Sequence, residues 1–210
     1  MVQHMVDVSG HNKAFVSDPD GAFRACKRAN IDFCYVKTAE GRSYEFQQFP
    51  TLAMSAGCQG LSVGAYHFAR PDVREGDAKL EAEHFLSSIK GIPLQLAPVL
   101  DIETAKDWKG EAKGLARWCL DWCQHVYEAT GRMPVIYTGP GFWGSHLGRS
   151  TALMDMRLWV AAYPRLLPPS SHPPPTLGTW RPTAWQYTGE GKVLGVDGVV
   201  DLSYVYGDMS

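Results

Sequence analysis

Short strand-like apolar runs alternate with longer helical segments through the first 138 residues of this sequence. The expected strands cover residues 4–9, 31–38, 61–69, 96–103 and 134–138. The expected helices cover residues 19–30, part of 44–60, 74–91 and 111–131. This alternation is typical of a parallel sheet with crossover helices, because each new strand must start from the same edge of the sheet as the last.

Three further strand-like runs follow at residues 157–164, 183–191 and 198–206, where the helical patterns fade. Eight expected strands in 210 residues favour one closed sheet. We therefore expect a single domain over residues 1–210 with an α/β fold. It should be an irregular TIM-like β/α barrel with eight strands and reduced helices in its C-terminal part. The Pro-rich run 165–182 is expected to be a surface loop of this domain.

Local signals mark several helix boundaries. Asp18 is placed to cap a helix that begins at Pro19. Pro50 either breaks or begins the helix in 44–60, and Gly131 ends the longest helix. The segment 74–91 carries an apolar stripe, which predicts that these side chains face the core: Leu80, Phe85, Leu86 and Ile89.

The composition argues against several classes of partner. The formal net charge is −2 and no Lys/Arg-rich run is present, so nucleic acid is a poor partner. No apolar run approaches the roughly 20 residues that cross a membrane. The N-terminus lacks the pattern of a Sec-type signal peptide, so we expect a protein made in the cytoplasm that leaves by another route. No heptad or apolar stripe demands assembly, and a monomer is expected.

Four acidic residues fall on expected strands near their ends: Asp7, Asp101, Glu103 and Asp201. In a parallel barrel the carboxyl ends of the strands form one rim, where the active site lies. Asp101 and Glu103 are two positions apart, so they project to the same side if the strand runs through both. Two carboxyl groups held close raise each other's cost of ionising, and one tends to keep its proton. Such a pair suits acid catalysis, and it also suits a metal ion.

Aromatic and charged side chains occur near the same strand ends. They are Tyr66, Tyr137, Trp159, Tyr163 and Trp185, with Lys37 and Glu40 on the second strand. An acidic cleft lined by aromatic rings is typical of glycosidases, because sugar rings stack on aromatic faces. Hard cations also bind carboxylate oxygens, but the aromatic residues favour a sugar. We predict that these residues contact substrate, although Lys37 and Glu40 could simply pair with each other.

Several motifs together resemble one known family almost from end to end. In chain order they are "VDVSGHN", "YVKTAEGRSY", "GAYHFARP", "PVLDIE", "VIYTGPGFW", "LWVAAYP" and "AWQYTGEGKVLGVDGVVDLSYVYG". In this combination they resemble the glycoside hydrolase family 25 lysozymes, the muramidases of Chalaropsis type. The resemblance implies an irregular β/α barrel that cleaves the β-1,4 bond between N-acetylmuramic acid and N-acetylglucosamine in peptidoglycan.

The resemblance also implies residue roles. Glu103 of "DIE" would be the general acid, and Asp101 would stabilise positive charge or orient the acetamido group of the substrate. Asp7 of "VDVS" and Asp201 of "VDLS" would be the other two acids of the site. The family position after "VDL" is often Asn, and here it is Ser203. No cofactor and no metal ion are implied, and the small size suggests a phage endolysin released by a holin.

Two other functions stay open at this point. A metal-dependent phosphodiesterase on a barrel would need the acids together with a His, and His67 is the one His on an expected strand end. A non-catalytic peptidoglycan-binding protein could keep the cleft, although a binder has no need of all four acids.

Overall fold

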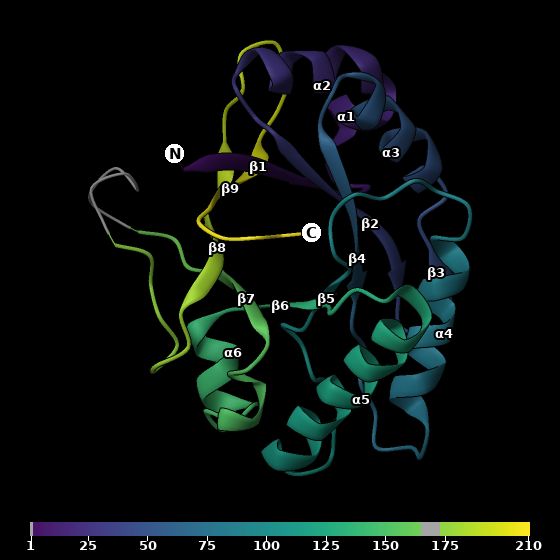
Figure 1. Ribbon diagram of the computed structural model, residues 1–210, viewed down its shortest axis with the longest axis vertical. Helices are drawn as coiled ribbons and strands as arrows, with labels where there is room; N and C mark the ends of the chain where they lie inside the picture. The colour runs from purple at the N-terminus through teal and green to yellow at the C-terminus, as the bar shows by residue number, and fades with distance from the viewer. Residues whose placement is uncertain (1, 165–172) are drawn as a thin grey trace.

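The structure is a computed structural model that describes residues 2–164 and 173–210 (Figure 1). Eight strands form the barrel: β1 Gln3–Val8, β2 Phe33–Glu40, β4 Ser62–Phe68, β5 Val99–Asp101, β6 Val135–Thr138, β7 Arg157–Ala161, β8 Pro182–Gly191 and β9 Val200–Val205. Neighbouring strands follow the order β1-β9-β8-β7-β6-β5-β4-β2, and pairing of β1 with β2 closes the ring. The predicted irregular eight-stranded barrel is thereby confirmed.

One strand breaks the parallel pattern. The strands from β1 through β2, β4, β5, β6 and β7 to β8 pair in parallel. β9 runs antiparallel to both β8 and β1, so the beginning of β9 lies beside the end of β1. A two-residue strand, β3 Tyr44–Glu45, pairs with the end of β2 outside the ring.

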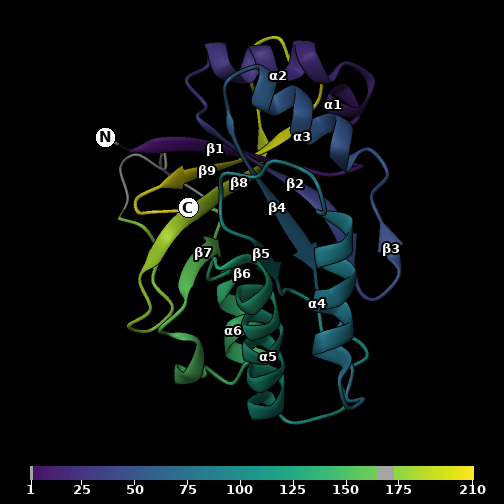
Figure 2. The same cartoon turned by 45° about the vertical axis from the view of Figure 1, so that its right-hand side comes forward.

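Helices surround only part of the barrel. They are α1 Lys13–Ser17, α2 Pro19–Arg28, α3 Phe49–Cys58, α4 Asp77–Ser88, α5 Ala112–Thr130 and α6 Pro140–Ser145, with a 3-10 turn at Thr151–Leu153. The long helices α4 and α5 pack side by side, as Figure 2 shows. After β6, the described residues form only the short α6 and the 3-10 turn as helical elements, and β8 leads to β9 without a helix. The expected loss of helices toward the C-terminus is confirmed.

The local boundary signals act as expected. The Gly21 N–H donates to the Asp18 side chain at 3.0 Å, which caps α2. Pro50 lies in the first turn of α3, so it begins that helix. Gly131 follows α5 with a φ of 70°, a left-handed conformation that glycine adopts readily. The short α1 and α6 were not expected, because five or six residues carry too little periodicity to be recognised.

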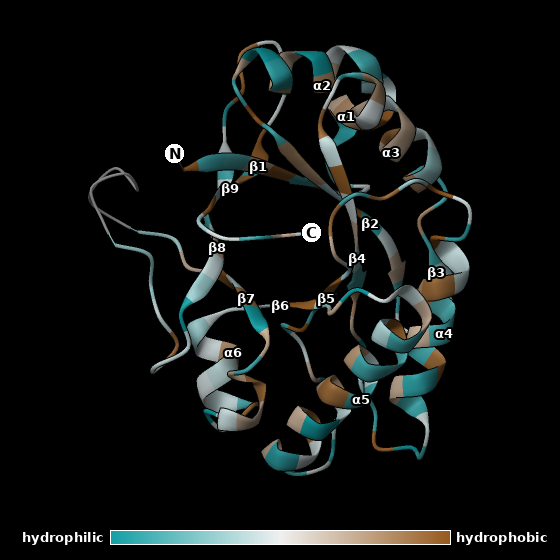
Figure 3. Ribbon diagram, in the orientation of Figure 1, coloured by the Kyte–Doolittle hydropathy of each residue, from teal (hydrophilic) through white to brown (hydrophobic). Residues whose placement is uncertain are grey.

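Two hydrophobic layers lie on opposite faces of the barrel wall, and Figure 3 shows hydrophobic stretches along the strands. The outer layer lies between the strands and the helices, and the inner layer fills the barrel below the site. In the inner layer the Tyr35 ring packs directly on Gly64, where a Cβ would come within 2.2 Å of the ring. Gly64 is therefore required for this packing.

Two expectations about single elements are wrong. Leu80 is 48% exposed, because α4 turns Ala78, Glu81, Ala82 and Phe85 toward the barrel instead. The strand expected at 96–103 narrows to β5, so Glu103 lies beyond its end. Of the expected Pro-rich loop 165–182, residues 165–172 lie outside the described residues.

Candidate active site

Each barrel strand places at least one inward side chain around the same pocket. In strand order from β1 to β9 these are Asp7, Lys37, Tyr66, Asp101, Tyr137, Trp159, Gln186 and Asp201. Alternation along each strand explains the set, because successive side chains point to opposite faces of the sheet. Ser9, His11, Phe68, Glu103 and Tyr163 complete much of the rim. The cavity has a volume of about 280 Å³ and opens at the carboxyl ends of the parallel strands.

Asp101 and Glu103 occupy different depths in this pocket. Asp101 ends β5 and is 7% exposed, and its Oδ1 atom has no hydrogen-bond partner among the described residues. Burial raises its pKa well above the usual range, and the carboxyl groups of Glu103 and Asp7 raise it further. Glu103 lies at the exposed rim, and burial of its carboxyl group also raises its pKa, although Lys37 and Arg70 oppose the rise.

Asp7 and Asp201 face each other across the antiparallel pair β1–β9, where they are register partners. Burial raises the pKa of Asp7 well above its usual range, and the charge of Asp201 adds to the rise. Burial raises the pKa of Asp201 to about 6. Two like charges at opposed strand positions repel each other, so the pair resists double ionisation.

Gln186 is a pocket residue that the sequence prediction missed. Its Nε2 donates to Asp7 Oδ2 at 3.0 Å, and its Oε1 accepts from the hydroxyl groups of Tyr137 and Tyr163 at 2.8 and 2.7 Å. The prediction chose Trp185 instead, which is a correction. Trp185 points to the outer layer and donates from Nε1 to the Ala162 carbonyl at 2.6 Å.

The alternation of β8 explains the correction. Ala184 belongs to the inner layer, so Gln186 faces inward and Trp185 outward. Alternation counted from the small residue Ala184 is the signal that could have found Gln186. The two register shifts in the pairing of β8 with β9 lie beyond Gln186 and leave this part of the strand regular.

Lys37 and Glu40 do pair, as the alternative interpretation held. Lys37 Nζ lies 2.5 Å from Glu40 Oε2, and the Arg70 side chain binds Glu40 Oε1 at 2.6 Å. Burial alone would raise the pKa of Glu40, but the hydrogen bonds from the two cations lower it. Lys37 lines the pocket, whereas Glu40 lies beside it and holds Lys37 and Arg70 in place. The predicted contact of Glu40 with substrate does not match this position.

The other predicted contact residues line the pocket. Tyr66, Tyr137 and Trp159 form its walls, and Tyr163 stands exposed at the rim. Trp159 Nε1 donates to Ser203 Oγ at 3.0 Å, so Ser203 serves as a buried acceptor that fixes the Trp159 ring. The aromatic walls thus have set orientations before any ligand binds.

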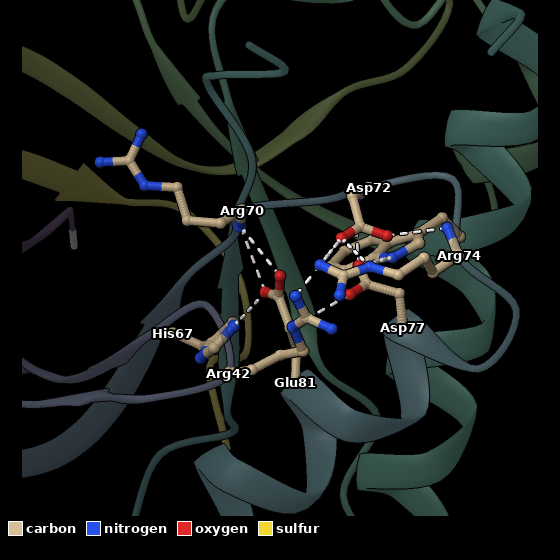
Figure 4. Close-up of polar contacts among 8 residues, drawn as sticks. Arg42, His67, Arg70, Asp72, Arg74, Asp77 and Glu81 are labelled. Atoms are coloured by element: carbon tan, nitrogen blue, oxygen red, sulfur yellow. Dashed lines mark hydrogen bonds and ion pairs between the residues drawn. The ribbon is translucent and has the colours of Figure 1, made fainter. Parts of the chain in front are cut away.

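A second polar cluster lies outside the barrel wall, between β4 and the helices α4 and α5 (Figure 4). His67 points away from the pocket, stacks on Trp122 at 5.5 Å and pairs through Nε2 with Glu81 Oε2 at 2.7 Å. Glu81 also accepts from the Arg70 backbone N–H at 3.1 Å. Burial raises the pKa of Glu81 to about 8 and lowers that of His67 to about 3, so both shifts favour a neutral pair sharing one proton.

Asp77 continues this outer cluster at the start of α4. Its Oδ2 accepts from the Asp72 backbone N–H and from Trp118 Nε1, both at 3.0 Å. Arg42 Nε lies 3.4 Å from Asp77 Oδ1. The cluster ties the segment after β4 to α4 and α5, and this segment carries Arg70 to the edge of the pocket.

The arrangement bears on the metal-dependent alternative. Among residues 2–164 and 173–210, no group of three or more His, Cys, Asp and Glu side chains is arranged to hold a metal ion. His67 faces the outer cluster and does not reach the four acids. The phosphodiesterase interpretation thereby loses His67, the histidine on which it depended.

The pocket defines a class of protein. Carboxyl groups with raised pKa values surround a cavity with aromatic walls at the rim of a β/α barrel. This arrangement is typical of enzymes that cleave glycosidic bonds. The family described as "Glycosyl hydrolases family 25" matches residues 6–196. The chain belongs to this family and is a glycoside hydrolase.

Individual proteins support the same grouping. "Lysozyme M1" of Streptomyces globisporus is 33% identical over 93% of this chain and 67% of its own length. "N,O-diacetylmuramidase" of Chalaropsis sp is 28% identical over 87% of this chain and 91% of its own. The crystal structure of a bacterial lysozyme from Streptomyces coelicolor matches with a TM-score of 0.83 and 28% identity, covering 98% of this chain and 93% of the other.

The chain is shorter than some of these relatives. It spans 67% of the length of Lysozyme M1 and 60% of the Escherichia coli protein YegX, to which it is 29% identical over 84% of its own length. Within the described part of the chain, the helices are too short or too polar to span a bilayer.

Proposed function

We propose that this glycoside hydrolase is a lysozyme, a 1,4-β-N-acetylmuramidase. It would hydrolyse the β-1,4 bond between N-acetylmuramic acid and N-acetylglucosamine in bacterial peptidoglycan. The observation that carries the proposal is the group of four acids, Asp7, Asp101, Glu103 and Asp201, enclosed by aromatic walls in one cavity. The names of the relatives from Streptomyces globisporus and Chalaropsis support the choice of substrate.

Glu103 is the residue best placed to act as general acid. It lies at the open rim, where a leaving-group oxygen can reach it, and its raised pKa keeps the proton available. The transfer of that proton to the glycosidic oxygen breaks the bond to the anomeric carbon and leaves positive charge on the sugar ring. Lys37, held by Glu40, limits how far the pKa of Glu103 rises.

Asp101 lies deeper and suits a different task. Its Oδ1 atom has no hydrogen-bond partner among the described residues, so it is available to a substrate group. It can stabilise the developing positive charge or accept a hydrogen bond from the acetamido N–H of the substrate. A protein nucleophile and assistance by the acetamido group both fit this position.

The walls would bind the glycan. Tyr66, Tyr137 and Trp159 bring aromatic faces and edges into the cavity, and Tyr163 offers an exposed ring at the entrance. Sugar rings present apolar C–H faces, so stacking on such rings would hold the glycan across the acids.

We also propose that the enzyme acts as a monomer, since residues of one chain line the pocket. Light scattering tests this proposal, and a dimer mass would contradict it.

The test is digestion of purified peptidoglycan in the presence of EDTA, followed by mass spectrometry of borohydride-reduced products. We expect new reducing ends on N-acetylmuramic acid, and a loss of about 1000-fold in Glu103→Gln, because general acid catalysis contributes 10²–10⁴-fold. The matched control is Glu83→Gln, an exposed acid on α4, which should keep full activity.

Three outcomes would contradict the proposal. Products with reducing ends on N-acetylglucosamine would assign a different bond. Activity lost with EDTA would favour the metal-dependent alternative. Binding to walls without new reducing ends would indicate a glycan-binding protein.

We further propose that the enzyme acts as a phage endolysin, made in the cytoplasm and released to the wall by a holin. The proposal follows from its activity, because a muramidase that reaches the wall from inside lyses the cell. Cells that express the chain should lyse when a holin is co-expressed and should stay intact without one. Lysis without the holin, or none with it, would contradict this role.

A further inference from the structure

The Gln186 side chain links the acids of the pocket to its aromatic walls. It is 2% exposed and comes from β8, opposite Asp7 of β1. Its amide makes three hydrogen bonds of 2.7–3.0 Å, one to Asp7 and two with the hydroxyl groups of Tyr137 and Tyr163. None of the roles assigned above uses it.

The contacts fix which way round the amide lies. A phenolic hydroxyl has one proton to give, and an amide oxygen can accept two such protons. Tyr137 and Tyr163 can therefore both donate to Oε1. This arrangement leaves the Nε2 group pointing at Asp7 Oδ2, so Asp7 must accept a hydrogen bond there. In the reversed orientation Oε1 would face Asp7 Oδ2, which is unfavourable for an ionised Asp7 because two acceptors would be in contact.

The donor distinguishes the two members of an opposed acid pair. Asp7 and Asp201 are register partners, and two carboxyl groups in such a position titrate as a pair that resists losing both protons. A hydrogen bond given to one carboxyl group stabilises its charged form. Because the amide is aimed at Asp7, it favours the charged form of Asp7 and opposes the burial and the charge of Asp201, which raise the pKa of Asp7.

We propose that Gln186 is a positioning residue, which fixes the Asp7 carboxyl group through the hydrogen bond from Nε2 and favours the charged form of Asp7. Other titratable or charged groups also face this pair: His11 after β1, Lys37 of β2, Tyr66 of β4, Asp101 and Glu103 of the β5 end, Tyr137 of β6 and Tyr163 after β7. They act on both acids from across the cavity, whereas Gln186 contacts one of them. The functional consequence rests on the proposed muramidase activity.

The test compares Gln186→Met and Gln186→Glu with the wild type in the pH profile of kcat/KM. Methionine keeps the length of the side chain and gives no donor, so the pKa of Asp7 rises. We expect the acidic limb of the profile to move up by about one to two pH units, since a hydrogen bond to a charged group is worth that much. A loss of rate with no shift of the limb would overturn the proposal.

Gln186→Glu gives the opposite pH dependence. A protonated glutamate can still donate to Asp7 and accept from the tyrosines, whereas an ionised one places a further negative charge beside Asp7. We expect this variant to work best at low pH and to lose activity as the pH rises. A uniform loss at all pH values would show that Gln186 only fills space or contacts substrate.

A second measurement does not depend on catalytic activity. Carboxyl ¹³C NMR titration, with Asp7 assigned from its Asn variant, should show a higher pKa of Asp7 in Gln186→Met than in the wild type. Tyr163→Phe, which removes an exposed hydroxyl donor, should give a smaller shift in the same direction. Unchanged Asp7 titration would overturn the proposal even if the wild type cleaves peptidoglycan. A wild type that cleaves no peptidoglycan would instead refute the proposed function, and the titration would still be decisive.

Discussion

Two groups of buried acids lie on opposite faces of the same barrel wall, and they differ in their hydrogen-bond partners and neighbouring charges. Outside, Glu81 and Asp77 accept hydrogen bonds from backbone N–H groups, Asp77 also accepts from Trp118, and the two acids pair with His67 and Arg42 respectively. Inside, Asp101 leaves one oxygen atom without a partner among the described residues, and Asp7 faces another acid across the strand pair.

The difference separates a stabilising cluster from a reactive one. A buried carboxyl group with several donors and a basic partner costs little and fixes the elements around it. A buried carboxyl group with few partners and like charges nearby costs stability, and it is available to a ligand. The inner acids should therefore govern activity, and the outer acids should govern the free energy of unfolding.

Among the variants that compare the two groups of acids, Asp101→Asn should have the largest effect. The amide keeps the shape of the side chain and removes the negative charge, so kcat/KM on peptidoglycan should fall about 100-fold. Because that charge is buried and near two other acids, urea unfolding at pH 7 should show equal or greater stability. An unchanged rate, or a clear loss of stability, would place Asp101 with the structural acids.

Glu81→Ala should show the reverse pattern. It leaves His67 and the Arg70 N–H without partners and opens a cavity, so the free energy of unfolding should fall by about 3 kcal/mol. Activity per folded molecule should persist at permissive temperature. The control is Glu83→Ala on the same helix, where the side chain is 55% exposed and the change should stay below about 0.5 kcal/mol. Equal effects in both variants would refute the comparison.

Asp201→Asn should change how stability depends on pH. Burial raises the pKa of Asp201 to about 6 in the folded state, against about 3.9 in an unfolded chain. The folded state thus holds the proton more tightly, and the wild type loses stability as the pH rises from about 4 to 6. The variant does not lose this stability. Its free energy of unfolding should therefore equal that of the wild type near pH 4 and exceed it by the order of 1 kcal/mol above pH 6.

Thermal unfolding across that pH range measures the effect. An advantage that grows toward acid pH would contradict the sign of the shift. The same measurement on an Asp77→Asn variant should show no such gain, because the amide would lose the ion pair with Arg42 and weaken the hydrogen bonds from the Asp72 N–H and Trp118 Nε1.

Leu80→Lys should have the smallest effect. The apolar stripe of α4 suggested a core position, but Leu80 is 48% exposed. A lysine there should change the free energy of unfolding by less than about 0.5 kcal/mol, whereas Phe85→Ala on the buried face should cost about 3 kcal/mol or more. A large effect of Leu80→Lys would mean that the surface of α4 is covered in solution.

Sequence patterns predicted much of the fold because the signals are local. The cap at Asp18, the start of α3 at Pro50 and the end of α5 at Gly131 depend on a few neighbouring residues. The parallel barrel followed from alternation of apolar runs with helices, and the motif "DIE" marked the pocket because two carboxyl groups at the end of a buried strand indicate a functional site. Elements of five or six residues, such as α1 and α6, show too little hydrophobic periodicity to be predicted from the sequence.

By itself, then, the sequence determined the barrel, the family and the inward acids of the parallel strands. Tertiary structure alone decided that β9 runs antiparallel, which sets Asp201 opposite Asp7. It also decided that Gln186 faces the acids while Trp185 packs outside, and that His67 joins Glu81 across the wall. These outcomes depend on strand direction, on the side of the sheet that each residue faces and on pairing between distant segments, and closure of the whole barrel fixes them rather than any local pattern.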